Sequence, residues 1–398
     1  PLNYDDRIAQ LSACDWVIEV IAERLDWKQE LYARIQPHLK STAIVTSNTS
    51  GISAAELISK MDNDMSSRFF ITHFFNPPRY MKLVEIVTSN KTNETLIAPM
   101  SKFLENVLGK GVVYANDTPN FIANRIGVYG MMATLESARK MKLSIEDVDA
   151  LTGTLIGRPK SATFRTADIV GLDTMCFVAN TAYEKCIDDT DREKFKIPDY
   201  LKHMVDNGWL GQKADQGFYK KIEKGVIHSI DLDTLKYSPQ RKKKYSGIGL
   251  AKEFSASGDK IKALVNSPDI AGEFIWEVTA NTLLYSAYRV GEIAGDIVNI
   301  DRAMRWGFGW STGPFEVWDS IGLKDSLDRM KVEGRNIPRW IESMIDAGNE
   351  SFYSNIKGVS MYWDIDMQEY TPIPKSKKQL SFLDFNDSNN IIEKHWSA

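Results

Sequence analysis

Short apolar runs alternate with amphipathic stretches over the first 116 residues. The apolar runs lie at 16–21, 43–47, 69–74, 83–87 and 112–114. Between them, as in 26–40, apolar residues recur every three or four positions, which is typical of helices that cover a sheet. This alternation predicts a parallel α/β sheet, and ligands of such sheets lie beyond the carboxyl ends of the strands.

From residue 117 onward the pattern predicts long helices instead. Pro119 suits the first position of a helix, Thr118 suits its cap, and an apolar helix is expected over 121–141. Ser144 begins a capping-box-like sequence for the next helix. We expect this helical domain to end near 217–219.

A weaker copy of the helical pattern recurs further along the chain. The sequence D-I-V-G-L-D at 168–173 has a counterpart in D-S-I-G-L-K at 319–324. The basic run at 241–244 lies between the two copies, and we interpret it as solvated chain rather than a phosphate site. The expected division is an incomplete nucleotide-binding domain (1–116), a helical domain (117–220), a polar linker (221–267), a degenerate second helical domain (268–357) and an irregular tail (358–398).

Composition narrows the class of protein. The 398 residues are 43% hydrophobic and 26% charged, with a formal net charge of −4, which gives no argument for nucleic-acid binding. The three cysteines lack metal-type spacing and favour a reducing compartment. No apolar run reaches the roughly 18 residues of a membrane span. These features predict a cytoplasmic protein.

The strongest candidate chemistry is a histidine followed by a carboxylate. His73 ends an apolar run, and Glu85 follows it twelve positions later. Histidine can move a proton near neutral pH, and a carboxylate commonly orients its ring. Ser50 and Asn124 add polar groups in neighbouring segments. Taken singly, each has an ordinary structural interpretation: a hydrogen-bonded core histidine, a surface charge, a helix cap and a buried turn.

Four sequence blocks favour a functional site over these structural interpretations. They read S-N-T-S at 47–50, H-F-F-N-P at 73–77, M-K-L-V-E at 81–85 and D-T-P-N-F-I-A-N-R at 117–125. In this order they resemble the L-3-hydroxyacyl-CoA dehydrogenase family, with departures at Gly51, where the family commonly has serine, and at Asn120, where it has glycine.

The resemblance implies a role for each matching residue. His73 would be the general base and Glu85 its partner, while Ser50 and Asn124 would bind the substrate oxygen and Asn76 would touch the substrate. The residues implied for the cofactor NAD are Glu23, Lys28, Asn48 and Ser50. The implied activity is oxidation of an L-3-hydroxyacyl-CoA to a 3-oxoacyl-CoA in fatty-acid β-oxidation.

The resemblance also implies the architecture. A Rossmann-like domain would precede two tandem helical domains of the 6-phosphogluconate-dehydrogenase C-terminal type, as in long bacterial members. An enoyl-CoA hydratase/isomerase-like domain can follow in such proteins, and a homodimer is compatible with the family. The chain contains no G-x-G-x-x-G, so we expect it to be a fragment without the first βαβ unit and with weakened NAD binding.

Two other functions remain open. One is a related dehydrogenase of a free hydroxy acid, and the other is a non-catalytic acyl-CoA-binding or assembly module. A serine hydrolase is disfavoured because Ser50 lacks the G-x-S-x-G elbow. A metal site is not expected because the remaining histidines are scattered without ligand spacing.

Overall fold

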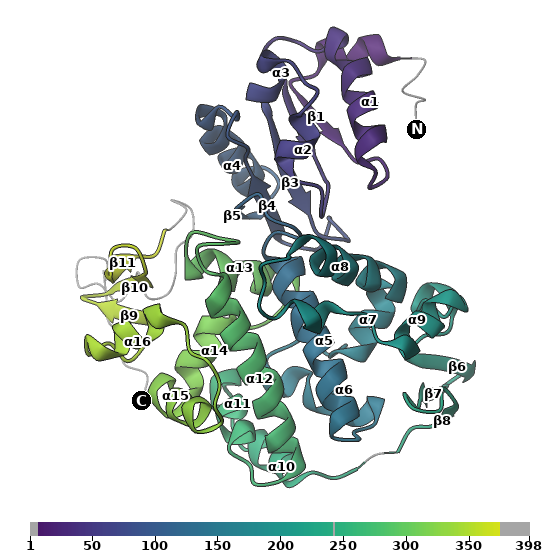
Figure 1. The fold of residues 1–398 in the computed structure, drawn as a ribbon, viewed down its shortest axis with the longest axis vertical. Coiled ribbons are helices and arrows are strands. Elements are labelled where there is room, and N and C mark those ends of the chain that lie inside the picture. The colour runs from purple at the N-terminus through teal and green to yellow at the C-terminus, as the bar shows by residue number, and fades with distance from the viewer. Residues whose placement is uncertain (1–6, 242, 375–398) are drawn as a thin grey trace, which may run out of the picture.

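The computed structural model describes residues 7–241 and 243–374. A five-stranded sheet with the order β1-β2-β3-β4-β5 forms the N-terminal domain (Figure 1). Its strands are β1 (Trp16–Glu19), β2 (Ile44–Ser47), β3 (Phe69–Phe74), β4 (Leu83–Val87) and β5 (Gly111–Ala115). Its helices are α1 (Leu25–Ile35), α2 (Ala54–Ile58), α3 (Asn63–Ser67) and α4 (Ile97–Asn106). The strands therefore lie where the apolar runs predicted them.

The sheet is not parallel throughout, which corrects one expectation. β1, β2 and β3 are parallel, whereas β4 pairs antiparallel with β3 and parallel with β5. Only residues 75–82 separate β3 from β4, and a parallel crossover needs about a dozen residues or more. The chain must therefore turn back on itself between these two strands.

A helical unit follows the sheet. Its helices are α5 (Ala123–Lys140), α6 (Ile145–Leu151), α7 (Phe164–Val170), α8 (Leu172–Lys185) and α9 (Asp199–Asp206). A small antiparallel sheet of β6 (Tyr219–Glu223), β7 (Val226–Ile230) and β8 (Tyr237–Pro239) ends the unit. Ser144 caps α6 as expected, since its hydroxyl accepts a hydrogen bond from Asp147 N.

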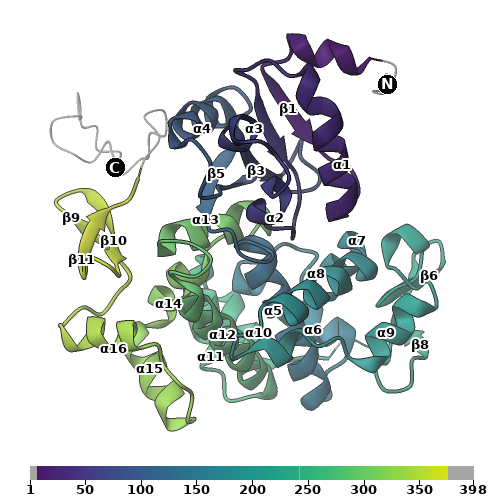
Figure 2. The same ribbon diagram turned by 45° about the horizontal axis from the view of Figure 1, so that its top comes forward.

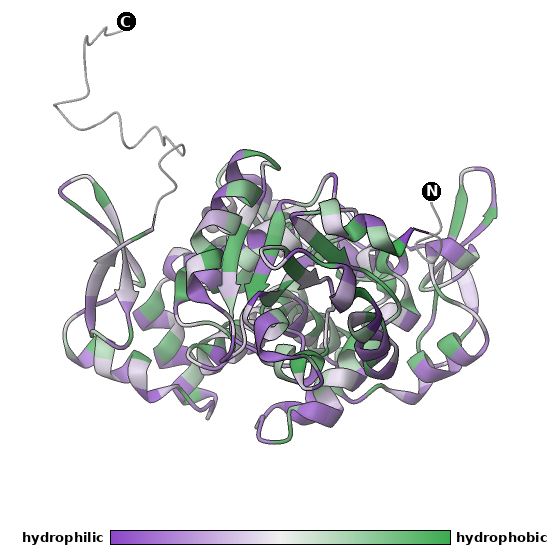
Figure 3. Ribbon diagram, turned by 90° about the horizontal axis from the view of Figure 1, so that it is seen from above, coloured by the Kyte–Doolittle hydropathy of each residue, from purple (hydrophilic) through white to green (hydrophobic). Residues whose placement is uncertain are grey.

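A second helical unit repeats this order after two additional short helices. Its helices are α10 (Ser246–Lys252), α11 (Ser257–Val265), α12 (Ile270–Arg289), α13 (Ile297–Gly307), α14 (Pro314–Ile321), α15 (Leu323–Val332) and α16 (Arg339–Asp346). A small sheet of β9 (Tyr353–Ile356), β10 (Val359–Asp364) and β11 (Glu369–Pro372) ends it. The two small sheets lie at opposite ends of the molecule (Figures 2 and 3).

The two units repeat the same set of hydrogen bonds. In the first, Asp168 accepts from the backbone N–H groups of Phe218 and Tyr219, and the Tyr219 hydroxyl donates to Asp149. In the second, the matching bonds join Asp319 to Phe352 N and Tyr353 N, and the Tyr353 hydroxyl to Asp301. This repetition supports the interpretation of the second unit as a copy of the first.

Two segments expected to be irregular are folded. The segment 221–267 contains most of the first small sheet and also α10 and α11, the first two helices of the second unit. Residues 359–372 form β10 and β11, while 375–398 lie outside the described residues. The sequence pattern did not predict these strands and helices because they are short and largely polar. In the basic run, Arg241 N donates to Glu146, and Lys243 pairs with Asp147.

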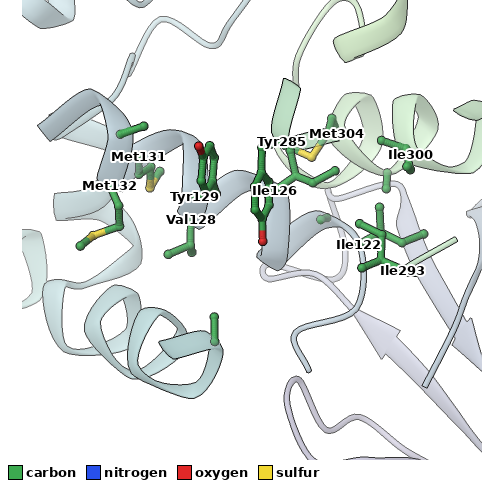
Figure 4. Packing of buried hydrophobic residues seen from close by; sticks show 14 of the residues in the cluster. Ile122, Ile126, Val128, Tyr129, Met131, Met132, Tyr285, Ile293, Ile300 and Met304 are labelled. Atoms are coloured by element: carbon green, nitrogen blue, oxygen red, sulfur yellow. The ribbon is translucent and has the colours of Figure 1, made fainter. Parts of the chain in front are cut away.

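The core between the two units centres on α5 and α12 (Figure 4). The rings of Tyr129 and Tyr285 stack with centroids 3.7 Å apart. The fully buried Arg125 donates to Asp189 Oδ2 at 2.6 Å and to the Tyr285 hydroxyl at 2.5 Å. The second unit therefore packs on the helix that begins at the candidate site.

Two structural features are absent from residues 7–241 and 243–374. No helix there combines the length and apolarity that a membrane crossing requires. Within the same ranges, no group of three or more His, Cys, Asp or Glu side chains is arranged to hold a metal ion.

Candidate active site

The antiparallel pairing of β3 and β4 creates the centre of the site. His73 lies directly opposite Glu85 in the strand register, so both side chains project from the same face of the sheet. The ring nitrogen Nδ1 of His73 lies 2.7 Å from Glu85 Oε2. Because a carboxylate can only accept, Nδ1 carries the proton in this bond, and Nε2 is the basic nitrogen.

Glu85 also fixes the start of α5. Its second oxygen, Oε1, accepts hydrogen bonds from Ile122 N at 3.1 Å and Ala123 N at 2.8 Å. This corrects the predicted cap, because the helix begins at Ala123 and the buried Thr118 hydroxyl has no partner among the described residues. Asn120 and Phe121 have φ of 65° and 51°, and this left-handed backbone prevents an earlier helix start.

Aromatic rings hold the imidazole from two sides. The ring of Phe75 lies 4.6 Å from the His73 ring, and that of Phe121 lies 5.7 Å from it, between centroids. His73 is only 5% exposed. Its Nε2 makes no hydrogen bond to any residue that the structure describes, so this nitrogen is free to accept a proton.

The end of β2 lies next to the end of β3. Asn48 Oδ1 accepts a hydrogen bond from Phe74 N at 2.9 Å, and the amide nitrogen of Asn48 has no bond to the described residues. The turn 49–51 that carries Ser50 follows directly. Ser50 does not cap α2, since Ser53 does so in a capping box with Glu56.

Glu23 organises the turn around Ser50. Its Oε1 accepts hydrogen bonds from the Thr49 hydroxyl at 2.6 Å, Ser50 N at 2.9 Å and Gly51 N at 3.0 Å. The Ser50 hydroxyl is 3.5 Å from the same oxygen, a distance at which it is weakly held. The Ser50 hydroxyl can therefore reorient toward a bound molecule.

Sequence reasoning assigned no role to Glu19, which the structure places in a buried network with Lys28. The Lys28 ammonium donates to both carboxylate oxygens of Glu19, at 2.7 and 2.9 Å, and lies 3.6 Å from Glu23 Oε2. Tyr32 and Ser47 also donate to Glu19. The available signal was a carboxylate inside an otherwise apolar strand, which needs a buried partner.

Asn124 is brought to the same region by the loop after β5. It lies in the first turn of α5, directly after the Ala123 N–H that binds Glu85, and its side chain has no bond to any described residue. Asp117 ties this loop to α2 by accepting from the Ser53 hydroxyl at 2.8 Å and from Ala54 N at 2.7 Å. Asn76 is exposed, in the turn after β3.

Comparison with known proteins identifies the family of the chain. Residues 1–118 match the family model of the 3-hydroxyacyl-CoA dehydrogenase NAD-binding domain. Residues 121–221 and 274–362 match that of the C-terminal domain of the same family. The chain belongs to the 3-hydroxyacyl-CoA dehydrogenase family.

Several members of this family are similar over most of the chain. A probable 3-hydroxyacyl-CoA dehydrogenase of Bacillus subtilis is 46% identical over 398 residues, which are 100% of this chain and 50% of the relative. A putative fatty acid oxidation complex trifunctional enzyme of Rickettsia prowazekii is 31% identical over 98% of this chain and 51% of its own length. The chain thus spans about half the length of these relatives.

The solved structures support the fold. The crystal structure of 3-hydroxybutyryl-CoA dehydrogenase from Escherichia coli K12 is similar with a TM-score of 0.62 and 21% identity. The match covers 86% of this chain and 84% of that structure. This chain therefore shares its fold with that structure over most of its length.

Proposed function

We propose that this chain carries out the NAD-dependent oxidation of an L-3-hydroxyacyl-CoA to a 3-oxoacyl-CoA, a step of fatty-acid β-oxidation. The observation that carries the proposal is the buried His73–Glu85 hydrogen bond, which leaves Nε2 of the imidazole without a protein partner. Family membership and the name of the Bacillus relative support the same reaction.

His73 acts as the general base. Nε2 takes the proton of the substrate 3-hydroxyl, while the hydrogen on the same carbon leaves as hydride and the carbonyl double bond forms. The positive charge that develops on the imidazole is stabilised by Glu85, whose carboxylate already accepts from Nδ1. A positioned base of this kind is worth roughly 100- to 10,000-fold in rate.

Ser50 and Asn124 bind the substrate oxygen. The weakly held hydroxyl of Ser50 and the unbonded side-chain amide of Asn124 are donors that can follow this oxygen as it becomes a carbonyl. Asn76 lies exposed in the turn beyond β3 and is assigned to contact with the acyl-CoA.

The residues at the strand ends fit the nicotinamide half of NAD. Glu23 is partly exposed, Asn48 has an unbonded amide nitrogen, and Ser50 presents a hydroxyl, so acceptors and donors suited to a ribose and a carboxamide are present. When bound, NAD supplies the hydride acceptor. Lys28 acts on this site indirectly, because its ammonium is bonded to Glu19 and pairs with Glu23.

The assignment of location, partners and domains extends the same proposal. We assign the chain to a cytoplasmic protein that acts on acyl-CoA, with a homodimer and a hydratase/isomerase-like domain as features of the whole protein. The name of the Rickettsia relative, a putative trifunctional enzyme, supports the last feature. The domain boundary at 116 is part of the same proposal, whereas the small sheets extend the two helical units beyond the expected boundaries at 220 and 357.

One experiment separates this function from its alternatives. NADH formation by the full-length protein is measured with an L-3-hydroxyacyl-CoA and with the corresponding free L-3-hydroxy acid. We expect a kcat/KM at least 100-fold higher for the thioester. Preference for the free acid would indicate a hydroxy-acid dehydrogenase, and acyl-CoA binding without NADH formation would indicate a non-catalytic module.

A further inference from the structure

The second helical unit reaches the nucleotide domain through the last residues of α13. This segment consists of Trp306, Gly307 and Phe308. Each of these residues packs so tightly on the sheet or on α5 that no additional atom fits at the contact. A Cβ atom added to Gly111, at the start of β5, would lie 2.3 Å from the Trp306 ring, and one added to Gly127 of α5 would lie 2.0 Å from the Phe308 ring. Both distances are far below van der Waals contact, so each ring occupies space that a glycine leaves open.

The middle residue of this segment packs on the elements that hold the His73–Glu85 pair. A Cβ atom added to Gly307 would lie 2.5 Å from Cδ2 of Leu83 and 3.3 Å from Cβ of Ala123. Leu83 begins β4, the strand of Glu85, and the Ala123 N–H donates to Glu85. The second unit thus touches both the strand and the helix that the carboxylate connects.

A chain of aromatic contacts continues to the imidazole itself. The Phe308 ring lies 6.5 Å from the Phe75 ring between centroids, and the Phe75 ring lies 4.6 Å from the His73 ring. Such tilted and edge contacts fix the direction of each ring as well as its distance. Phe308 therefore limits where Phe75 can lie, and Phe75 limits the tilt of the imidazole.

Further hydrogen bonds hold the second unit against the sheet. Asn299 Oδ1 accepts a hydrogen bond from Tyr114 N, and Ile293 O accepts one from Asn116 N, so the edge of the sheet at β5 is bonded to the second unit. The side-chain amide of Asn116 donates to the backbone carbonyls of Gly291 and Glu292. The segment 306–308 is consequently anchored on both the sheet and α5.

We propose that Phe308 is a positioning residue for His73, and that the second helical unit is in this way part of the active site and not only packing for the first. The inference rests on the proposed function, in which His73 is the base. Loss of the ring lets Phe75 and the imidazole tilt away from the line between Glu85 and the substrate hydroxyl. Because a misplacement of about 1 Å can cost roughly 100-fold in rate, a small tilt is enough to be measured.

The test compares two matched phenylalanines of the second unit. Phe308 lies at the end of α13 and is partly exposed, whereas Phe315 is fully buried in the core of the same unit. We expect Phe308→Leu to lower kcat about tenfold with KM for acyl-CoA unchanged, following the same dependence on alignment. Phe315→Leu should lower the unfolding temperature and leave kcat unchanged.

A spectroscopic measurement tests the relationship without turnover. The Nδ1 proton of His73, held by Glu85, should give a downfield NMR resonance that shifts or broadens in Phe308→Leu and not in Phe315→Leu. An unchanged resonance together with a raised KM and normal kcat would overturn the proposal, because Phe308 would then be a wall of the substrate pocket. Failure of the wild-type protein to form NADH would refute the proposed function alone, since this resonance does not depend on it.

A double-variant comparison tests the contact itself. Gly127→Ala requires the Phe308 ring to move, so it should lower kcat in the wild type by about as much as Phe308→Leu does. In a Phe308→Ala background the same methyl group has free space, and Gly127→Ala should then add no further loss. Equal losses in both backgrounds would show that the Gly127–Phe308 contact does not act on the site.

Discussion

Glu19 and Lys28 form an ion pair from which water is excluded, with each side chain only 1% exposed and Nζ 2.7 Å from Oε1. This pair lies beneath the turn that carries Ser50, because Lys28 also approaches Glu23, and Glu23 holds the backbone of that turn. The Ser50 hydroxyl and the buried pair are therefore parts of one network.

Replacement of Lys28 alone should lower the free energy of unfolding strongly. In Lys28→Met the Glu19 carboxylate stays buried without its counter-charge, and breaking a buried pair in this way typically destabilises by about 3–5 kcal/mol. The free energy of unfolding from urea titration is the measurement. The double variant Glu19→Gln/Lys28→Met, which removes both charges, should recover at least half of the loss. A single variant that loses less than about 1 kcal/mol would contradict the assignment of a desolvated pair.

The role of His73 gives a kinetic prediction. His73→Gln removes the base but keeps a polar side chain, so turnover should fall by roughly 100- to 10,000-fold. NAD affinity, measured by fluorescence titration, should stay nearly unchanged because His73 is assigned to the substrate hydroxyl. His203→Gln, on the exposed side of α9, is the matched control and should be fully active. Near-normal turnover of the His73 variant would end its assignment as the base.

Two partly buried aspartates, one in each helical unit, predict how stability depends on pH. Burial raises the pKa of Asp149 to about 6 and that of Asp319 to about 7, from an ordinary value of 3.8. The folded protein therefore binds these protons more tightly than the unfolded chain does. Their contribution to stability is fully present below about pH 4 and is lost as pH rises toward 7, at roughly 1.4 kcal/mol for each unit of pKa shift.

Asp319→Asn should reduce this dependence. The variant does not titrate, so its free energy of unfolding should change less between pH 4 and pH 7 than that of the wild type. It should also lose stability at every pH, because an amide cannot accept from both Phe352 N and Tyr353 N. Asp206→Asn, at an exposed site, is the control and should keep the wild-type profile. Parallel profiles for the wild type and Asp319→Asn would contradict the raised pKa.

Local pattern was sufficient for most of the N-terminal domain. The runs at 69–74 and 83–87 coincide with β3 and β4, and the helix expected over 121–141 is found as Ala123–Lys140. These elements could be predicted because apolar periodicity along the sequence marks the face that each element buries. The His73–Glu85 pair was expected from the family pattern, and the strand register supplies its physical cause.

The remaining features depend on contacts between distant segments. The start of α5 is set by Glu85, which is 37 positions before Ile122 in the chain, so Thr118 looked like a cap when only nearby residues were considered. Glu19 and Lys28 are partners across a strand and a helix, and Phe308 meets Gly127 only after the two helical units have packed. A helix or strand pattern carries no information about such pairs.

The two departures from the family pattern are neighbours in space, which gives a last prediction. A Cβ atom added to Gly51 would lie 3.4 Å from Asn120 Oδ1, so a serine side chain at position 51 would lie in contact with the asparagine side chain. Asn120 has φ of 65°, which glycine also adopts readily, and its amide donates to Val178 O at 2.8 Å.

Asn120→Gly should therefore cost about 1–2 kcal/mol through the lost hydrogen bond and the space left behind. Gly51→Ser should be better tolerated in the Asn120→Gly background than alone, with a coupling of about 0.5–3 kcal/mol in a double-mutant cycle of unfolding free energies. Additive effects of the two substitutions would show that the two positions do not share this space.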